Sequence, residues 1–509
     1  MGYMNEFPHS RMFDSDLREI LELYNSLSNL PTELKKLNEK IESEIGESLD
    51  NMIKEGRISA LISGIVYVKS YGAIGDGVND DTEAIQRALN SSTNNKFGIV
   101  YFENGTYITG KLTIPSNITI LGASNAIIKA KNSLNDYLLY TYDTENVTIA
   151  NIQIDGNKAN NDYVKNNFAC RNFTIFNCVL QNFNDYNPIQ CYGDNTKIIS
   201  NHVFNTDACD LIAFSSGNNC VIADNILENA ADTDIVVAAG AKNVTVTGNV
   251  CIRGGNKQLD NAQSIAIAGA EHVTVVGNVL IGNDSNVAGI RVYIDPNTNE
   301  ETKNIIISNN VIKNFSKTQG IIVSCENCNI TNNLLKNCGT SIYIGRCSNL
   351  ILNDNTIIDY ETAILFAYDE CNKISIANNL GTAKPDIITY GIRFLYFNIS
   401  DVKIVNNSIT GASKSYDNIE SQLTDAIIVA NDEIDLRNTV TQPQLSKETE
   451  ISNNNFFGCH IYISEPIEME VITEHKTFNI TNNYVFLNPK DKIRVISDVS
   501  DITWTWIGE

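Results

Sequence analysis

The chain has 509 residues and a net charge of −23, with 60 acidic against 37 basic residues. Hydrophobic residues make up 43% and charged residues 19%, so the chain can bury a core and is not disordered by composition. The acidic balance disfavours nucleic acids and anionic membranes as partners, because both are bound through cationic surfaces. It does not exclude a glycan, which binds through local hydrogen bonds.

The first 64 residues predict a helical segment. The stretch "DSDLREILELYNSL" from Asp14 onward has apolar residues at heptad-like spacing, and Pro31 separates it from a second stretch of this kind. Such a narrow apolar stripe most simply pairs with copies of itself. We therefore expect residues 1–64 to form an α-helical, coiled-coil-like segment that oligomerises the chain and attaches it, through residues 1–60, to other proteins.

The N-terminus lacks the basic stretch followed by an apolar stretch that a signal peptide requires. No run approaches the roughly 18 apolar residues of a membrane span. The sequence therefore predicts a protein that is made in a cytoplasm, is not secreted by the usual route and is not inserted in a membrane.

Residues 65–130 predict an N-terminal cap and the first coils of a repeat. "VYVKSYGA" is typical of a strand, "IGDGVNDD" of a tight loop and "DTEAIQRALN" of an amphipathic helix. Asp80 or Asp81 stands where a helix N-cap belongs, and Gly75 and Gly77 suit a sharp turn. We expect capping and turn roles for these four residues, and a calcium site is the alternative.

A short unit recurs through residues 131–490, as in "NVTVTGNVCI" (243–252) and "NIIISNNVIK" (304–313). After each unit come a variable loop and another short β run, such as "IVVA" (235–238). Three short strands per repeat of about 25 residues predict an all-β fold, a single-stranded right-handed parallel β-helix. The turn asparagines should adopt the left-handed region and hydrogen-bond to each other between coils: Asn225, Asn249, Asn278, Asn310, Asn333, Asn355, Asn379, Asn407, Asn454 and Asn483.

Twelve cysteines suggest disulfides or zinc at first sight, but the repeat gives them another place. Cys325, Cys347 and Cys371 each lie eight residues before a turn asparagine, and Cys220 and Cys328 share an offset of five. We therefore expect columns of small buried thiols, as suits a reducing compartment. The last segment, residues 491–509, predicts strands whose Trp504 and Trp506 cover the final coil.

A family resemblance rests on the stretch "YGAIGDGVNDDTEAIQRAL" followed by "VYFENGTYI". It resembles the N-terminal motif of pectate-lyase-like (pectin-lyase-like) β-helix proteins, which include phage tail spikes and polysaccharide-degrading enzymes. The opening "FPHSRMFDSDLREILELY" is similar to leader segments of tail appendages of phages that infect Gram-positive bacteria. The resemblance implies a virion protein of the phage tail, a homotrimer released by host lysis.

Acidic residues cluster in two adjacent repeats, "FNTDACDLIAF" and "NAADTDIVVAAG". Asp210 and Asp234 directly precede β runs, and Asp207 and Asp232 lie just upstream. Because stacked coils are about 4.8 Å apart, these four carboxylates should share one face. Like charges so close raise at least one pKa, which lets a carboxylic acid stay protonated as a general acid. Structural capping and non-catalytic glycan or ion binding are the alternatives, and the sequence points to no metal ion and no cofactor.

Part of this cluster resembles polygalacturonase-type glycoside hydrolases. Asn205-Thr206-Asp207 with Asp210 is similar to their NTDGxD motif, and Asp232-Thr233-Asp234 stands in place of their Asp-Asp pair. Gly289-Ile290-Arg291 matches their Gly-β-Arg motif, but their histidine and lysine are missing here. The resemblance implies acid/base roles for Asp207, Asp232 and Asp234 and substrate binding by Arg291, whereas the missing residues argue against galacturonate specificity.

Further substrate-binding candidates follow corresponding strands, where arginine can pair with an acid and tyrosine can stack on a sugar ring: Arg393, Tyr192, Tyr293, Tyr343 and Tyr396. We therefore expect a phage tail spike that recognises a host surface glycan (capsule, teichoic acid or another wall polysaccharide) and hydrolyses it with paired aspartates. The alternatives are a non-catalytic receptor-binding appendage, a polysaccharide lyase and a bacterial polysaccharide-degrading enzyme.

Overall fold

The fold is that of a computed structural model, which describes residues 65–92, 98–207, 210–254, 262–283, 287–367, 371–385, 387–395, 399–417, 423–424, 427–429, 450–452, 459–473, 475–487, 490–497 and 504–508. The helical and attachment predictions for residues 1–64 lie outside the described residues, as do Tyr396 and Asn454.

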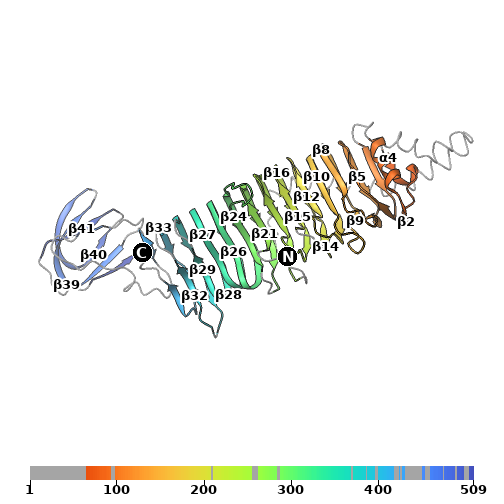
Figure 1. Cartoon of the computed structure of the whole chain (residues 1–509). Coiled ribbons are helices and arrows are strands. Elements are labelled where there is room, and N and C mark those ends of the chain that lie inside the picture. Colours follow the sequence, from red (N-terminus) through yellow and green to blue (C-terminus); the bar gives the residue numbers. More distant parts are fainter. Residues whose placement is uncertain are drawn as a thin grey trace, which may run out of the picture.

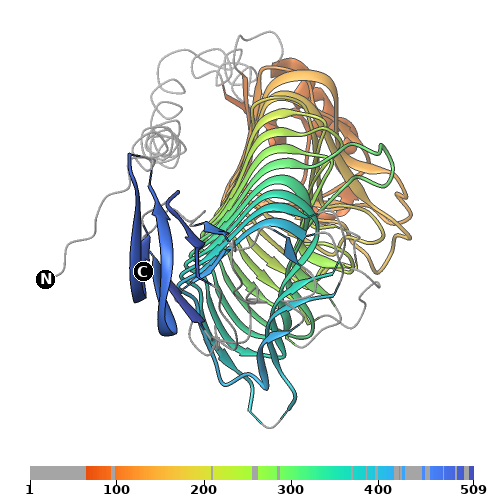
Figure 2. The same ribbon diagram turned by 90° about the vertical axis from the view of Figure 1, so that its left-hand side faces the viewer.

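Strands β1 to β37 pair in parallel and wind into an elongated β-helix (Figure 1). Figure 2, turned by 90°, shows the coils superimposed one behind another. Each regular coil supplies one strand to each of three parallel sheets. The predicted all-β parallel β-helix with three strands per repeat is therefore confirmed.

The first sheet contains the strand that precedes each turn asparagine. It consists of β1 (Ile65–Tyr67), β3 (Gly98–Phe102), β6 (Ile118–Gly122), β8 (Tyr137–Ala150), β10 (Lys165–Phe176), β13 (Thr196–Ile199), β16 (Asn218–Ala223), β19 (Lys242–Thr247), β22 (Glu271–Val276), β25 (Lys303–Ser308), β26 (Val311–Thr331), β27 (Leu334–Asn353), β30 (Asn372–Ala377), β33 (Ile399–Val405), β36 (Leu423–Thr424) and β37 (Ile427–Val429).

The second sheet contains the strand after each asparagine. It consists of β2 (Asp76–Asp80), β4 (Gly105–Thr109), β7 (Ala126–Ala130), β9 (Gln153–Asp155), β11 (Val179–Gln181), β14 (His202–Phe204), β17 (Ile226–Glu228), β20 (Val250–Ile252), β23 (Val279–Ile281), β28 (Thr356–Tyr360), β31 (Leu380–Ala383) and β34 (Ser408–Thr410). The long strands β26 and β27 bend through all three sheets.

The third sheet contains the remaining strand of each coil. It consists of β5 (Leu112–Thr113), parts of β8 and β10, β12 (Ile189–Tyr192), β15 (Ile212–Ser215), β18 (Ile235–Ala238), β21 (Gln263–Ala268), β24 (Ala288–Tyr293), parts of β26 and β27, β29 (Thr362–Phe366), β32 (Tyr390–Phe394) and β35 (Lys414–Asp417).

The core follows from the period-2 alternation of the strands. Ile212, Ile235, Ile265 and Ile290 stand in register on β15, β18, β21 and β24, and all four are fully buried. Burial of each such side chain contributes roughly 1.5–3 kcal/mol relative to exposure. The side chains at the neighbouring positions of each strand point away from this core. They form the outward face of the third sheet.

A ladder of buried asparagines follows the turn between the first and second sheets. From Asn201 to Asn379, each Nδ2 donates to the Oδ1 of the asparagine one coil further on, at 2.8–3.0 Å, and Asn407 is the acceptor for Asn379. This confirms the predicted contacts between coils. The left-handed backbone belongs to the preceding residue, such as Asn309 at φ 56° and Asp354 at φ 58°, so the two expected roles fall on neighbouring positions.

The predicted thiol stacking is confirmed for Cys325 and Cys347, which pair in register. Cys220 and Cys328 stand in one line, but the three positions between them are Val244, Val273 and Ile305, so the predicted column of thiols is wrong there. The ten cysteines from Cys170 to Cys371 in the described residues are buried and form no disulfide. Burial raises the pKa of Cys178 to about 12 and raises the pKa of Cys220 well above its ordinary value, so these thiols stay protonated and unreactive.

The N-terminal cap uses its aspartates as the capping and turn prediction proposed. Asp81 is buried and accepts hydrogen bonds from the amides of Ile74 (2.6 Å) and Gly75 (3.0 Å), which closes the loop. Asp80 accepts the amide of Thr82 at 3.0 Å, at the start of helix α4 (Thr82–Ser92). The stretch expected to be only a loop contains β2, and a 3-10 helix, η1 (Val68–Tyr71), follows β1.

Helix α4 lies at one end of the stack (Figure 1), with Ile85 and Leu89 fully buried in the main core. It thereby covers an edge that would otherwise expose unpaired strands. Neither η1 nor α4, the helices of the described residues, has the length and hydropathy to cross a membrane.

The C-terminal region differs from the prediction of one β-helix over residues 131–490. Within the described residues β37 is the last strand of the parallel sheets, and an antiparallel sheet follows: β38 (Glu450–Ser452), β39 (Cys459–Ile472), β40 (Thr477–Leu487), β41 (Lys492–Val495) and β42 (Trp504–Gly508). It has its own core, which includes Met469 and Val471. The unit at 478–486 was misread because any half-buried strand shows the same alternation. Strands β41 and β42 lie within residues 491–509, and the cover of the final coil by Trp504 and Trp506 stays a prediction.

Candidate functional site

Asp210 and Asp232 lie together at the starting edge of the third sheet. Asp210 precedes β15 and Asp232 precedes β18, and the two segments are joined by hydrogen bonds from the Leu211 amide to the Thr233 carbonyl and from the Ile212 amide to the Asp234 carbonyl, both 3.0 Å. Both side chains are partly exposed. The repeat stacking therefore brings two of the four predicted carboxylates to one accessible place.

The environment of this pair favours a protonated acid. Burial, reinforced by the charge of Asp232, raises the pKa of Asp210 to about 7. Burial also raises the pKa of Asp232, against opposing effects of the Thr233 hydroxyl, which donates to Oδ1 at 3.2 Å, and of Arg253. A carboxylic acid that holds its proton near neutral pH beside a second carboxyl has the properties of an acid/base pair.

Asp234 is fully buried and has a different environment. Its Oδ2 lies 3.3 Å from Nε of Arg253, which is also fully buried. Burial raises the pKa of Asp234 to about 6 in spite of this cation. Arg253 Nη1 donates to the Ala230 carbonyl at 2.8 Å, and Nη2 donates to the carbonyls of Asp232 and Gln263. Asp234 and Arg253 therefore hold the segment that presents Asp232.

The sequence interpretation did not single out Arg253, although a signal was present. It follows β20 directly, in the coil next to the acidic cluster. Arginine is almost never buried unless it is paired, so an arginine at a strand end beside buried acids is a candidate partner for one of them.

Asp207 lies at the edge of the site. Its Oδ2 is 3.6 Å from Nζ of Lys158, its amide donates to the Phe183 carbonyl at 3.0 Å, and it forms an isolated bridge with Asn184. Its carboxylate is thus engaged with a partly exposed lysine.

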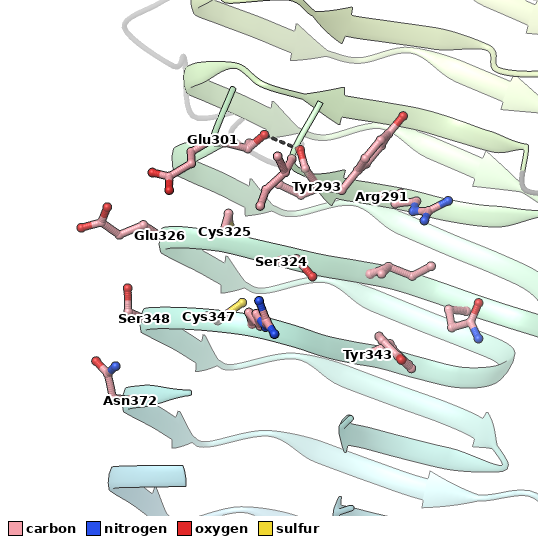
Figure 3. Close-up of a pocket in the computed structure, with 16 residues that line it drawn as sticks. Arg291, Tyr293, Glu301, Ser324, Cys325, Glu326, Tyr343, Cys347, Ser348 and Asn372 are labelled. Atoms are coloured by element: carbon pink, nitrogen blue, oxygen red, sulfur yellow. Dashed lines mark hydrogen bonds between the residues drawn. The ribbon is translucent and has the colours of Figure 1, made fainter. Parts of the chain in front are cut away.

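Arg291 and Tyr293 line a groove of about 850 Å³ over β24, β26 and β27. The Arg291 guanidinium lies 4.8 Å from the centre of the Tyr293 ring. Burial raises the pKa of Tyr293, the Arg291 charge opposes this rise, and the charges of Asp232 and Asp210 add to it. Strand β24 is two strand steps beyond β18, which follows Asp232. Figure 3 shows Glu301, Glu326, Ser348 and Asn372 along one side of the groove, and Arg291 and Tyr343 on the other.

The remaining predicted ligands are further apart. Tyr192 on β12 pairs with Ser215 on β15, so it stands in the coil before the acid pair. Arg393 lies four strands beyond Arg291, in register through Ile322, Tyr343 and Leu365. Its Nε is 3.0 Å from Oδ2 of Asp417, and its guanidinium lies 4.0 Å from the centre of the Tyr390 ring. Within the described residues, no group of three or more His, Cys, Asp or Glu side chains is arranged to hold a metal ion.

Comparison with known proteins supports the same architecture. Residues 65–267 match the family described as rhamnogalacturonase A/epimerase, pectate lyase-like. The chain has a pectate-lyase-like β-helix fold. The A-module of mannuronan C-5 epimerase AlgE6 from Azotobacter vinelandii is similar over 72% of this chain and 98% of that one, with a TM-score of 0.54 and 19% identity.

Two phage proteins are also similar. The pre-neck appendage protein of Bacillus phage B103 is 29% identical over 177 residues, which are 30% of this chain. The chain spans 20% of the length of that relative. A mutant tailspike protein of E. coli bacteriophage HK620, solved in complex with a pentasaccharide, is similar over 89% of this chain and 94% of that one, with a TM-score of 0.52 and 12% identity. At these identities the two solved structures share the fold alone.

Proposed function

We propose that this protein is a phage tail appendage that binds a host surface glycan on the outward face of the third sheet and hydrolyses it with Asp210 and Asp232. The observation that carries the proposal is the pair of neighbouring, partly exposed carboxyls, of which Asp210 has a pKa of about 7, beside a groove lined by Arg291 and Tyr293. The similarity to the pre-neck appendage protein of Bacillus phage B103 supports a place in the virion.

In the proposed reaction the Asp210 carboxyl donates its proton to the oxygen of the glycosidic bond as that bond breaks. The Asp232 carboxylate either takes a proton from the attacking water or attacks the anomeric carbon itself. Carboxyl groups about 5–5.5 Å apart favour the covalent, retaining course, and about 6.5–9.5 Å the inverting one. Asp234 and Arg253 position Asp232, and Asp207 is an additional acid at the edge of the site.

The test is incubation of the purified protein with wall or capsular glycan from the host, followed by measurement of reducing ends. We expect Asp210→Asn and Asp232→Asn each to slow release by at least about a hundredfold, the usual contribution of a general acid or base. Asp359→Asn is the matched control, because Asp359 lies on β28 of the second sheet and asparagine accepts its φ of 57°. Wild-type rates in both site variants would disprove the assignment.

A lyase is the second candidate, and Arg291 favours it. This guanidinium stacks on Tyr293 and makes no ion pair within the described part of the chain, so it is available to neutralise a sugar carboxylate. Unsaturated products with ultraviolet absorbance would identify a lyase. Saturable binding without any product would identify a non-catalytic receptor-binding appendage.

The proposal includes assembly. We expect a homotrimer joined and attached to the tail through residues 1–60, because the heptad-like spacing there suits self-association. Light scattering of the full chain against a chain lacking residues 1–60 tests this directly: a trimeric mass should be found only for the full chain.

A further inference from the structure

Four tyrosines and two lysines gather on the N-terminal coils of the third sheet, outside the acid pair and the groove. We call this group the tyrosine–lysine platform: Lys111, Tyr137, Tyr140, Tyr163, Lys165 and Tyr186. Lys111 Nζ lies 4.1 Å from the centre of the Tyr140 ring, and Lys165 Nζ lies 4.4 Å from the centres of both the Tyr137 and Tyr186 rings. The rings also contact one another, with centroids 4.8 Å apart for Tyr137 and Tyr140 and 5.5 Å apart for Tyr163 and Tyr186.

The platform is accessible. Tyr186 is 46% exposed, and the other five side chains are partly exposed. An aromatic face that remains in contact with solvent offers a stacking surface, because aromatic rings combine a large apolar area with a polar edge.

The two ammonium groups lack acidic partners. In a chain with 60 acidic residues, neither Lys111 nor Lys165 forms an ion pair within the residues that the structure describes. A tyrosine face attracts a cation at an exposed site by only about 0.5–1 kcal/mol, and it leaves the positive charge without a counter-ion. Their charge therefore remains available to an anionic ligand.

The platform is continuous with the acid pair. Lys165 is on β10 and Asp210 precedes β15, two strand steps away through β12, or about 10 Å at the usual spacing. Tyr186 is followed by Asn187, whose Oδ1 accepts the amide hydrogen of Asp210 at 3.0 Å. A chain lying along the helix axis across Asp210 would therefore meet Lys165 next.

We infer that the tyrosine–lysine platform is a subsite for an anionic sugar, with the rings packed against sugar faces and the two lysines paired with a carboxylate or phosphate group. The inference rests on the proposed function and narrows it, because it selects an acidic glycan over a neutral one. The sugar residue bound at Lys165 is then only a few sugar residues away from the glycosidic bond that Asp210 protonates.

The test is calorimetric titration of the full chain, in the Asp210→Asn background so that no glycan is consumed, with three probes. These are poly(glycerol phosphate) fragments that carry sugar substituents, oligogalacturonate and dextran oligosaccharides. At least one anionic probe should bind about tenfold more tightly than dextran, and its affinity should fall with salt. Lys111→Gln with Lys165→Gln should remove that advantage of about tenfold, or about 1.4 kcal/mol. The anionic probe that responds identifies phosphate or carboxylate as the ligand.

Two further variants keep the result interpretable. Lys336→Gln is the matched control, since Lys336 is exposed on the part of β27 in the second sheet, and it should bind like the parent. Lys165→Arg keeps the charge and should retain most of the affinity, which separates loss of charge from loss of fold. The inference is overturned if dextran binds as tightly as both anionic probes, if none of the three binds, or if the double variant binds like the parent. Unchanged cleavage of host glycan by the double variant in the wild-type background would leave the proposed hydrolysis standing and remove this inference alone.

Discussion

The β-helix buries two polar arrangements, the asparagine ladder and the Asp234–Arg253 pair. They differ in how many of their donors and acceptors have hydrogen-bond partners. In the asparagine ladder each side chain both donates to and accepts from its neighbours, and Asn278, for example, also donates to the Val246 carbonyl at 2.9 Å. At the edge of the third sheet, Asp234 has the nearby Arg253 cation, but within the described residues neither of its oxygens has a hydrogen bond of good geometry.

The difference separates a polar array that stabilises the coil from one that is poised for chemistry. A fully satisfied buried network makes each coil rigid. Incompletely compensated carboxyls keep raised pKa values, as Asp210 and Asp234 do, and such shifts are typical of functional sites. The following predictions test this contrast, from the largest expected effect to the smallest.

Removal of Arg253 should have the largest effect on stability. Arg253→Met leaves the Asp234 charge buried without a cation and frees three backbone carbonyls, so we expect a loss of about 3–5 kcal/mol in the free energy of unfolding. Denaturant unfolding of the full chain measures this loss. Arg253→Met with Asp234→Leu should recover part of it, and a double variant less stable than Arg253→Met would contradict the ion-pair interpretation.

A break in the ladder should come next. Asn278→Leu removes the acceptor of the Asn249 backbone and side-chain amides and the donor to the Val246 carbonyl, at about 1–3 kcal/mol for each group that stays unpaired. Asn310 Oδ1 keeps the hydrogen bond from the backbone amide of residue 278. Asn349→Gly is the control: Asn349 is exposed, makes one side-chain bond at 2.8 Å to Asn327, and has a φ of 55° that glycine accepts. The control should lose less than about 1.5 kcal/mol. Equal losses in thermal or denaturant unfolding would show that burial of the ladder does not matter.

The carboxyls should make stability depend on pH with a definite sign. Folded pKa values of about 7 for Asp210 and about 6 for Asp234 exceed the ordinary value of 3.8, so the folded state binds these protons more tightly than the unfolded state. Their contribution therefore lowers the free energy of unfolding as pH rises from about 4 to about 7. Asp210→Asn should flatten this dependence relative to Asp359→Asn, and an unchanged slope would contradict the shift.

The smallest effect is expected at Asp207. Its contact with Lys158 is a partly exposed ion pair, worth about 0–1 kcal/mol. Asp207→Asn should change the unfolding midpoint little and slow glycan cleavage much less than Asp210→Asn. A rate loss equal to that of Asp210→Asn would move Asp207 into the acid/base pair.

The repeat made most of the fold predictable. The spacing of Asn225, Asn249 and Asn278 determines the coil length, and the alternation in "IVVA" determines which side chains enter the core. The spacing of the repeat also predicts the register of Cys325 with Cys347. The C-terminal sheet was not predictable in this way, because "FNITNNYVF" has the local pattern of a coil while β40 pairs antiparallel with β39.

The sequence predicted where the site lies but not the environment of each of its aspartates. The spacing of the repeat predicts that the four aspartates lie on adjacent coils. The environment of each one depends on how loops of unequal length stack. Asp234 meets Arg253 from the following coil, and Asp207 meets Lys158 from an earlier one. Such contacts between coils carry no local signature, so the distinction between a positioning acid and a reacting acid required the structure.

The pH dependence of kcat/KM for cleavage of host glycan tests the central claim most directly. If Asp210 is the general acid, the wild-type rate should fall as pH rises through about 7. This falling limb should disappear in the slow residual activity of Asp210→Asn and persist in Asp359→Asn. A wild-type profile with the same falling limb in Asp210→Asn would contradict the account.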